Sequence, residues 1–237
     1  MAAETATGLK RGLAVLLALD GGGELGVTSI AERVGREKSQ VSRTLKVLAE
    51  HGLVERDPDS LAYRLGWRLF ALAGAAGDER LAAAAPAALR GLVHALGEVA
   101  HLSVLQDAGV LTVMSESPPH TVQAVNWVGR VVPVLGTSAG YALLLDHEPS
   151  ELRRFGPVGT LSKRLAEARA RGFTLVDEEF EPGLVAVGAP VRDFRGRIVA
   201  AVNVSAPKFR FAARLEQAGE HVRAVADDLS RTLGGAP

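Results

Sequence analysis

Cysteine is absent from the 237 residues of the chain. Without thiols the protein forms no disulfide, has no thiolate nucleophile and cannot be a zinc-finger type of DNA reader. Any metal site would need His and carboxylate ligands alone. Hydrophobic residues make up 47% of the sequence, so the chain can bury a sizeable core in one large domain or two smaller ones.

Long hydrophobic runs are also missing. No apolar stretch approaches the roughly 18 residues that a membrane-spanning helix needs. Residues 1–8 lack the basic start and following apolar stretch of a secretory signal. We therefore expect a cytoplasmic protein with no membrane partner.

Net charge is absent as well, because 27 basic residues balance 27 acidic ones. The whole molecule is therefore not a nonspecific binder of polyanions. The local charge differs, since residues 36–46 hold four basic side chains and only one acidic side chain, Glu37. Such a local excess suits a segment that meets phosphates.

Residues 36–51 predict a short helix with two different faces. At about 100° per residue, Val41, Leu45 and Leu48 fall on one side. The opposite side holds Ser39, Ser42, Arg43 and Lys46. These side chains hydrogen-bond phosphates and base edges, so the helix fits a DNA major groove. Taken alone, the same pattern also fits a solvated surface helix.

The neighbouring segments favour the DNA-binding interpretation. An apolar helical pattern at 9–19 stops at the break 20–23. A second short helix is predicted from Thr28, as its N-cap, to Gly35, as a left-handed end. Two short helices joined by a tight turn, the second with a basic polar face, form a helix-turn-helix.

A predicted hairpin follows this pair of helices. Residues 53–56 and 61–65 are typical of short strands, and Asp57-Pro58-Asp59-Ser60 is a turn between them. This hairpin is the wing of a winged helix-turn-helix.

The second half predicts strands covered by helices. A helical pattern at 67–85 meets Pro86, which either kinks it or begins a new helix to Leu96. Strands are predicted at 101–106, 110–115, 122–127, 131–135, 173–176, 184–191 and 197–205. Further helices are predicted at 140–146, 161–171 and 210–233. The fold class is therefore α+β, with an antiparallel sheet flanked by helices.

Several short motifs, taken together, carry a family resemblance. They are 38–45, 50–54, 135–140, 172–173, 177–183, 188–191 and 202–207. In their order and spacing the chain resembles the IclR family of bacterial transcriptional regulators over essentially its whole length. The resemblance implies a winged helix-turn-helix domain at 1–66, a linker helix at 67–85 and a GAF-like effector-binding domain at 86–237. It also implies dimers or tetramers on palindromic operators in double-stranded DNA, more often as repressors.

The resemblance assigns DNA contacts position by position. The residues facing base edges would be Ser39, Gln40, Ser42 and Arg43. Lys38 and Lys46 would lie nearer phosphates, and the wing residues Arg56 and Arg64 would touch the flanking backbone.

It also places a small-molecule effector site in the second domain. The corresponding positions are Ser138, Ala139, Asp177, Leu184, Ala186, Asn203 and Ser205. Exposed amides at the helix start near Ser138 would suit a carboxylate or another anion. The acidic cluster 177–179 is equally typical of a solvated strand end.

Three positions depart from the family pattern. Val176 stands where aspartate is frequent, Ala186 where cysteine is frequent and Tyr141 where lysine is frequent. The pocket is therefore more apolar than usual, and we expect a small organic acid with an apolar or aromatic body. Trp127 and Phe180 are either core or pocket wall.

Other motifs lead to alternative functions. Residues 21–26 match the dinucleotide pattern G-x-G-x-x-G, but they follow a predicted helix where the fingerprint requires a strand. Residues 136–140 match G-x-S-x-G, so a serine esterase would use Ser138 with Asp177 and His221. The predicted hairpins before Ser138 argue against the parallel sheet of a hydrolase.

Histidine spacing gives no metal motif. The histidines stand at 51, 94, 101, 120, 147 and 221, without H-E-x-x-H or another ligand spacing. We expect no metal and no cofactor. A DNA-binding scaffold whose second domain holds no ligand is a further alternative, and the sequence does not identify the effector or the operator.

Overall fold

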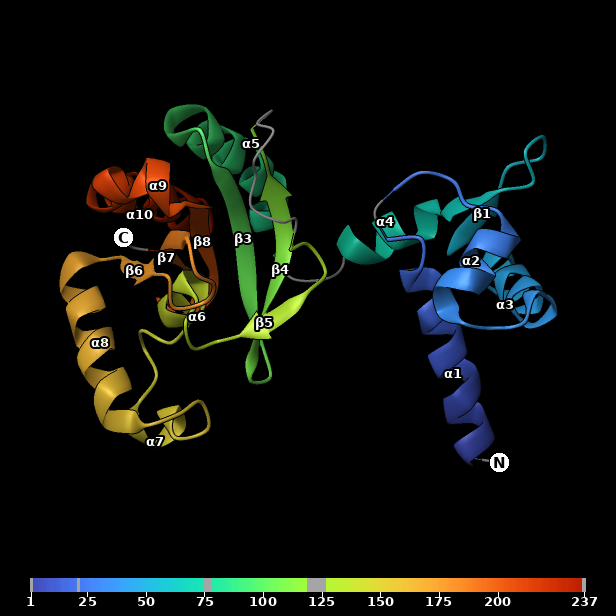
Figure 1. Cartoon of the computed structure of the whole chain (residues 1–237), viewed down its shortest axis with the longest axis horizontal. Coiled ribbons are helices and arrows are strands. Elements are labelled where there is room, and N and C mark those ends of the chain that lie inside the picture. Colours follow the sequence, from blue (N-terminus) through green and yellow to red (C-terminus); the bar gives the residue numbers. More distant parts are fainter. Residues whose placement is uncertain (1, 21, 75–77, 119–126, 236–237) are drawn as a thin grey trace. The chain divides into compact units, whose positions relative to one another are not determined.

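The structure is a computed structural model that describes residues 2–20, 22–74, 78–118 and 127–235 (Figure 1). Its contacts divide the chain into two compact units, residues 1–79 and 80–237. Each unit is described by itself. The predicted α+β class, with a helix-turn-helix first and an antiparallel sheet flanked by helices second, is confirmed.

The N-terminal unit contains the predicted winged helix-turn-helix. Its elements are α1 (Ala2–Leu17), α2 (Val27–Val34), α3 (Lys38–Glu50), β1 (Val54–Arg56), β2 (Tyr63–Leu65) and α4 (Trp67–Gly74). Ile30 of α2 and Leu45 of α3 are fully buried, and Val15 of α1 and Val54 of β1 pack in the same cluster. One small core therefore holds the three helices and the wing together.

The turn between α2 and α3 depends on one glycine. Gly35 has φ 61° and ψ 45°, and its N–H bonds back to the last turn of α2. Glycine adopts this left-handed conformation without steric cost, so the chain reverses here and α3 begins three residues later. The predicted N-cap was wrong by two residues, since α2 begins at Val27 with Gly26 in the cap position and no side-chain cap.

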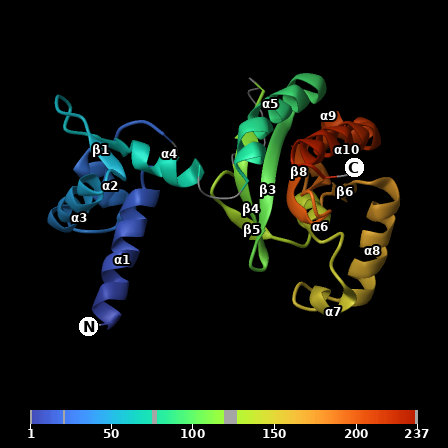
Figure 2. The same cartoon turned by 180° about the vertical axis from the view of Figure 1, so that it is seen from behind.

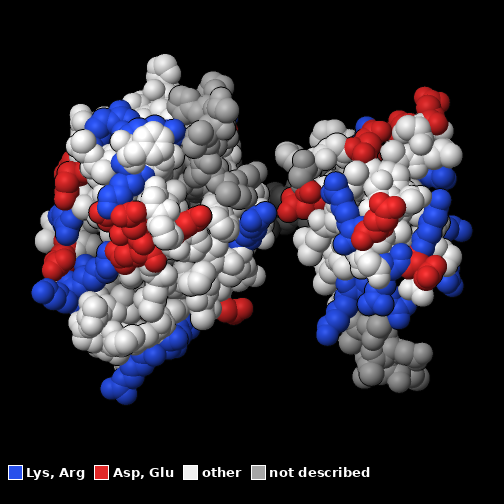
Figure 3. Space-filling model, viewed as in Figure 1, with Lys and Arg blue, Asp and Glu red and all other residues white. Residues whose placement is uncertain are grey.

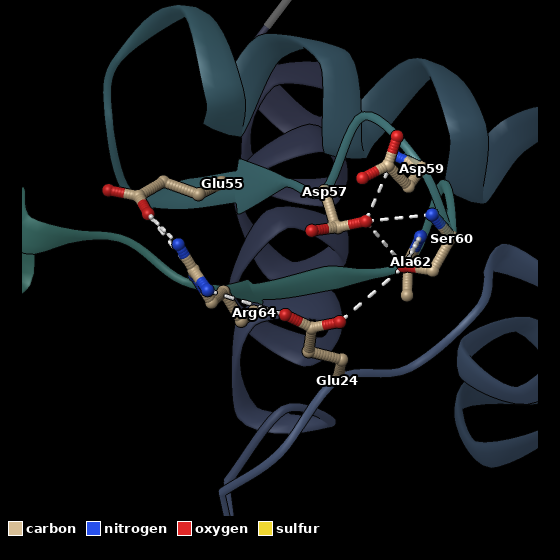
Figure 4. Close-up of polar contacts among 7 residues, drawn as sticks. All are labelled: Glu24, Glu55, Asp57, Asp59, Ser60, Ala62 and Arg64. Atoms are coloured by element: carbon tan, nitrogen blue, oxygen red, sulfur yellow. Dashed lines mark hydrogen bonds and ion pairs between the residues drawn. The ribbon is translucent and has the colours of Figure 1, made fainter.

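The wing is a two-stranded antiparallel hairpin whose turn is held by one carboxylate. Oδ1 of Asp57 accepts hydrogen bonds from the N–H of Asp59 at 3.0 Å and of Ser60 at 2.7 Å (Figure 4). The hydrogen bond from the Ser60 backbone is the main cause that holds the pKa of Asp57 below its usual value. The side chain thus makes the turn that the sequence predicts at 57–60.

The C-terminal unit is built on a six-stranded antiparallel sheet in the order β5-β4-β3-β8-β7-β6. The strands are β3 (Val99–Gln106), β4 (Gly109–Glu116), β5 (Val131–Pro133), β6 (Thr174–Asp177), β7 (Leu184–Arg192) and β8 (Ile198–Pro207). The chain enters the sheet at its centre, because β3 pairs with both β4 and β8. Side chains from distant parts of the sequence therefore meet on neighbouring strands.

Helices cover both faces of this sheet. They are α5 (Glu79–Leu96), α6 (Ser138–Leu143), α7 (Pro149–Leu152), α8 (Val158–Arg171), α9 (Lys208–Phe211) and α10 (Leu215–Thr232). Leu89 of α5 and Val222 of α10 share one core cluster with Val202 of β8. Ala142 of α6 and Leu165 of α8 belong to a second cluster, which includes Ala201 of β8. Because successive strand residues point to opposite faces, 201 and 202 mark the two sides of the sheet. Within this unit α5 and α10 lie together, as do α7 and α8, in both views (Figures 1 and 2).

Two predicted helices differ from the observed ones, and one predicted strand lies largely outside the described residues. The range 67–85 is divided between α4 and α5, with Asp78 outside both helices, and α5 continues past Pro86. Burial of Ala85 and Leu89 against the sheet offsets the hydrogen bond that proline cannot make. The final helix is interrupted near Arg214, whose φ of −111° is not helical. The strand predicted at 122–127 lies largely outside the described residues, and Trp127 belongs to no strand.

Candidate DNA-binding face and ligand cavity

The two faces of α3 are separated as the sequence predicts. Val41, Leu45 and Leu48 are 1%, 0% and 9% exposed and form the inner face. The polar residues Lys38, Ser39, Ser42, Arg43 and Lys46 are exposed, and Gln40 is half-buried. All six predicted contact residues on this helix are therefore reachable from solvent.

Local contacts orient part of this face. The Nε of Arg43 donates to the carbonyl of Ser39 at 3.3 Å, one helical turn earlier. The hydroxyl of Thr44 donates to the carbonyl of Gln40 at 3.0 Å. In Figure 3, Lys and Arg side chains lie over the part of the N-terminal unit that Figure 1 labels α3, with acidic side chains among them. The face is thus a local basic surface on a unit of mixed charge.

The two wing arginines differ in their surroundings. Arg64 forms ion pairs with Glu24 at 3.3 Å and with Glu55 at 3.1 Å (Figure 4). Arg56 lies over the ring of Tyr63, 5.6 Å from its centre, and its Nε donates to the carbonyl of Leu61 at 3.4 Å. A phosphate that contacts Arg64 would compete with two carboxylates for this side chain. The Tyr63 ring carries no net charge, so its contact does not neutralise Arg56.

A cavity opens on the α6 side of the sheet in the C-terminal unit. It encloses about 540 Å³ of empty space, part of it open to solvent. Six of the seven predicted effector positions line it: Ser138, Ala139, Leu184, Ala186, Asn203 and Ser205. Residues 184 and 186 on β7, and 203 and 205 on β8, share this face because they alternate along antiparallel neighbours.

Asp177 is the predicted position that does not reach the cavity. It ends β6 with its side chain exposed, while the preceding Val176 is buried and lines the cavity. Its Oδ1 lies 2.8 Å from Nζ of Lys208, and hydrogen bonding to Asp177 raises the pKa of that lysine. The strand alternation that turns Val176 inward turns Asp177 outward.

Several lining residues were not predicted from the sequence. The polar ones are His101, Ser103, Thr112 and Thr137. His101 and Ser103 stand at alternate positions of β3, a strand that is otherwise largely apolar. Polar residues at alternate positions on an apolar strand are therefore the signal by which this part of the site could have been found.

Two hydrogen bonds between side chains join β3 to β8 across the cavity floor, in addition to the backbone pairing of these strands. Nε2 of His101 lies 3.1 Å from Oγ of Ser205, and Oγ of Ser103 donates to Oδ1 of Asn203 at 3.4 Å. His101 is 3% exposed, and this burial lowers its pKa to about 4. Its other ring nitrogen, Nδ1, and the hydroxyl of Ser138 have no hydrogen-bond partner within the described part of the chain.

Trp127 and Phe180 form an aromatic wall of the cavity. Their ring centres are 5.5 Å apart in an edge-to-face arrangement, and both residues line the empty space. Their role as pocket wall is therefore settled by the geometry. A flat apolar or aromatic ligand would find suitable partners in these rings.

Tyr141 braces the segment that carries Phe180. Its hydroxyl donates to Oε2 of Glu179 at 3.1 Å and accepts from the N–H of Gly136 at 3.0 Å. Arg164 pairs with the same carboxylate. Tyr141, which stands where lysine is frequent in the family pattern, thus links the start of α6 to the loop after β6 through its hydroxyl. Burial is the main cause that raises the pKa of Tyr141.

The small residues at 136–140 allow close packing. A Cβ on Gly140 would lie 2.0 Å from the carbonyl oxygen of Val134, a distance at which atoms collide. The N–H of Gly140 bonds to the Thr137 side chain at 3.2 Å, and Ser138 is only 2% exposed. The amides predicted to be exposed here are therefore partly occupied by the chain's own cap.

The residues of the esterase alternative do not form a triad. No base among the described residues is hydrogen-bonded to Ser138, and Nδ1 of His221 lies 2.9 Å from the carbonyl of Gln217 on α10. Asp177 pairs with Lys208 instead of a histidine. The serine esterase alternative is not supported. Residues 21–26 follow helix α1 and precede helix α2, so they lack the strand of a dinucleotide site.

The described residues contain neither a metal-binding cluster nor a membrane-spanning helix. No group of three or more His, Asp or Glu side chains there could hold a metal ion. No helix in the described ranges is long and apolar enough to cross a membrane.

Comparison with known families matches both units. Residues 8–58 match the IclR helix-turn-helix domain, and residues 74–231 match the family described as bacterial transcriptional regulator IclR C-terminal. Together the two matches cover α2, α3, the first wing strand β1 and nearly all of the C-terminal unit.

Individual proteins agree with this assignment. The chain is 33% identical to the glycerol operon regulatory protein of Streptomyces griseus, over 95% of this chain and 96% of the relative. It is 30% identical to the transcriptional repressor AllR of Salmonella typhimurium, over 98% and 92%. An IclR homologue from Microbacterium hydrocarbonoxydans, solved with 4-hydroxybenzoate, has the same fold, with a TM-score of 0.76, 23% identity and coverage of 95% and 98%. The chain therefore belongs to the IclR family of bacterial transcriptional regulators, which carry a helix-turn-helix domain.

Proposed function

We propose that this protein is a cytoplasmic repressor that binds a palindromic operator as a dimer or tetramer and responds to a small organic acid. The observation that carries the proposal is the pairing of a solvent-facing basic helix in one unit with a lined cavity in the other. The relative AllR is named a repressor, and this supports repression over activation in the proposal. Binding of the ligand would change the affinity of the protein for the operator, and binding of the operator would change the affinity for the ligand by the same factor.

The proposed DNA contacts follow the exposed face of α3. Ser39, Gln40, Ser42 and Arg43 would read base edges, and Lys38 and Lys46 would contact phosphates. In the wing, Arg56 would contact the flanking backbone. Arg64 would do so only after leaving its two carboxylate partners, so we expect its contribution to be smaller.

Arg43→Ala is expected to weaken specific operator binding by about 1–3 kcal/mol, the usual scale for one good base contact. A matched variant, Lys46→Ala, is expected to weaken binding evenly on all sequences and to lower the salt dependence instead. Gel-shift titrations on the operator and on unrelated DNA, at two salt concentrations, measure both effects. Unchanged operator affinity for Arg43→Ala would remove this residue from the reading face.

Self-association is proposed through exposed apolar side chains of α1 and α4 in the N-terminal unit. Leu9, Leu13 and Leu17 recur every fourth residue on α1 and are 66%, 50% and 68% exposed. Trp67 and Phe70 of α4 are each 75% exposed and touch each other edge to face. A second copy of the chain would cover such side chains, and it would also present a second α3 to the other operator half-site.

The proposed ligand class follows from the cavity lining. Aromatic rings form one wall, hydroxyl, amide and imidazole groups form the floor, and no Lys, Arg, Asp or Glu of the described residues lines it. A small acid with an apolar or aromatic body would use both parts of this lining. The aromatic acid bound to the Microbacterium hydrocarbonoxydans homologue supports the choice of 4-hydroxybenzoate as a probe.

Aromatic acids are expected to raise the melting temperature of the C-terminal unit more than glyoxylate does. A ligand at 100 times its Kd adds about 2.7 kcal/mol to the free energy of unfolding, which corresponds to roughly 5–10 °C for a unit of this size. A thermal-shift screen of both acid types measures this difference. Stabilisation by very small polar acids alone would contradict the proposed class, and no effect of any metabolite on operator affinity would favour a scaffold without ligand.

A further inference from the structure

His101 is the one titratable side chain among the described residues that line the cavity. Across the sheet it stands opposite Ser115 of β4 and Asn203 of β8, neither of which ionises. Ser138 of α6 lines the same space. An imidazole is therefore the only described group at the cavity that can acquire a positive charge near neutral pH.

Charged groups beside these elements make contacts of their own, and the Arg130 guanidinium lies 5.4 Å from the ring centre of Trp127 in the cavity wall. On α6, Tyr141 bonds to Glu179, which also holds Arg164. On β4, Glu116 pairs with Arg90 at 3.2 Å. A carboxylate ligand would thus enter a cavity whose described lining holds no Lys or Arg. Burying such a charge without a counter-charge is unfavourable.

We propose that an organic acid binding in this cavity draws one proton from solvent onto the His101 ring, so that effector and protein form a carboxylate–imidazolium pair. This inference rests on the proposed ligand class. In the neutral ring one nitrogen carries hydrogen and the other does not. A second proton makes both nitrogens donors, so one can donate to the Ser205 hydroxyl at 3.1 Å while the other is available to the ligand.

The burial of His101 is consistent with this proton uptake. Burial holds the pKa of His101 at about 4, so the ring is neutral at pH 7 before the ligand binds. A carboxylate beside it favours the charged form and raises the pKa of the ring in the complex. Proton uptake then accompanies binding at every pH between the two pKa values, and affinity rises as the pH falls through this window.

The test is calorimetry of 4-hydroxybenzoate binding in phosphate and in Tris, whose ionisation heats differ. We expect uptake of up to one proton and a Kd that falls as the pH falls from 8 to 6, by at most about tenfold for each pH unit. The neutral amide, 4-hydroxybenzamide, is expected to bind without uptake. The sulfonate, 4-hydroxybenzenesulfonate, stays ionised throughout, so uptake with this probe assigns the proton to the protein and not to the ligand.

A pair of variants identifies the residue. His101→Gln is expected to abolish proton uptake with the acid while it still binds the amide, and His221→Asn on the surface of α10 is expected to leave uptake unchanged. Wild-type binding of the acid without uptake, or uptake that persists in His101→Gln, would overturn this inference and leave the ligand class intact. Failure of the acid and the sulfonate to bind at any pH would overturn the ligand class and this inference together. If His101→Gln does not fold, the sulfonate measurement on the wild type still decides whether the protein takes the proton.

Discussion

Leu45→Ala is expected to destabilise the N-terminal unit by about 2–5 kcal/mol, the range for removing a fully buried leucine. Leu45 is 0% exposed and lies between Val41 and Leu48 on the inner face of α3. The core it belongs to is small, since it draws on three short helices and the wing. Such a loss approaches the whole stability of a domain of this size. Operator binding is therefore expected to fall sharply, although the side chain lies in the core and not on the exposed face of α3.

Urea unfolding followed by gel shift measures both consequences. Val47→Ala is the matched control, because Val47 lies on the same helix and is 52% exposed. Its replacement is expected to change the free energy of unfolding by less than about 0.5 kcal/mol. An unfolding midpoint of Leu45→Ala equal to that of the wild type would contradict the packing described for α3.

Arg210→Met is expected to cost the C-terminal unit about 3–5 kcal/mol, the range for leaving one member of a buried ion pair alone. Glu98 is 3% exposed and stands immediately before β3. Its Oε1 and Oε2 accept from Nε and Nη2 of Arg210 at 2.6 and 2.8 Å. The two parallel bonds tie α9 to the start of the central strand, and methionine fills similar space without a charge.

An exposed pair of the same residue types provides the control. Arg90 and Glu116 are 61% and 34% exposed in their side chains, so Arg90→Met is expected to cost less than about 1 kcal/mol. The double change Glu98→Gln with Arg210→Met is expected to recover part of the loss, because it removes the stranded charge. Chemical unfolding of the four proteins gives these differences. Equal losses for Arg210→Met and Arg90→Met would show that the Glu98 pair contributes no more than a surface one.

Much of the architecture could be predicted from local patterns. Val41, Leu45 and Leu48 recur at helical spacing, and all are buried as the pattern predicts. The strands predicted at 101–106 and 110–115 pair as the hairpin β3-β4, and Asp107 in the turn between them has a φ of 53°, which Asp and Asn tolerate. The helix end at Gly35 was predicted for the same reason. These features depend on neighbours along the chain, so the sequence contains the information directly.

Errors appeared where a distant contact overrides the local pattern. Residues 67–85 and 210–233 have continuous helical spacing. The first range is nevertheless divided between α4 and α5, and the second between α9, a 3-10 helix (Ala212–Arg214) and α10. Phe211, which is fully buried, anchors the short helix α9 before the chain turns into α10. Packing of one side chain against the sheet outweighs the small gain of continuing a helix.

By itself, the sequence determined the winged helix, the exposed basic face of α3, the antiparallel strands and the resemblance that marked six cavity positions. Only the tertiary structure showed that Asp177 faces away from the cavity, that Arg64 is paired with Glu24 and Glu55, and that His101 joins Ser205. The reason is that helix faces and turns arise within a few residues, whereas the last contact joins side chains 104 positions apart. The register of the strands decides which distant side chains come into contact, and the packing of the whole sheet sets this register.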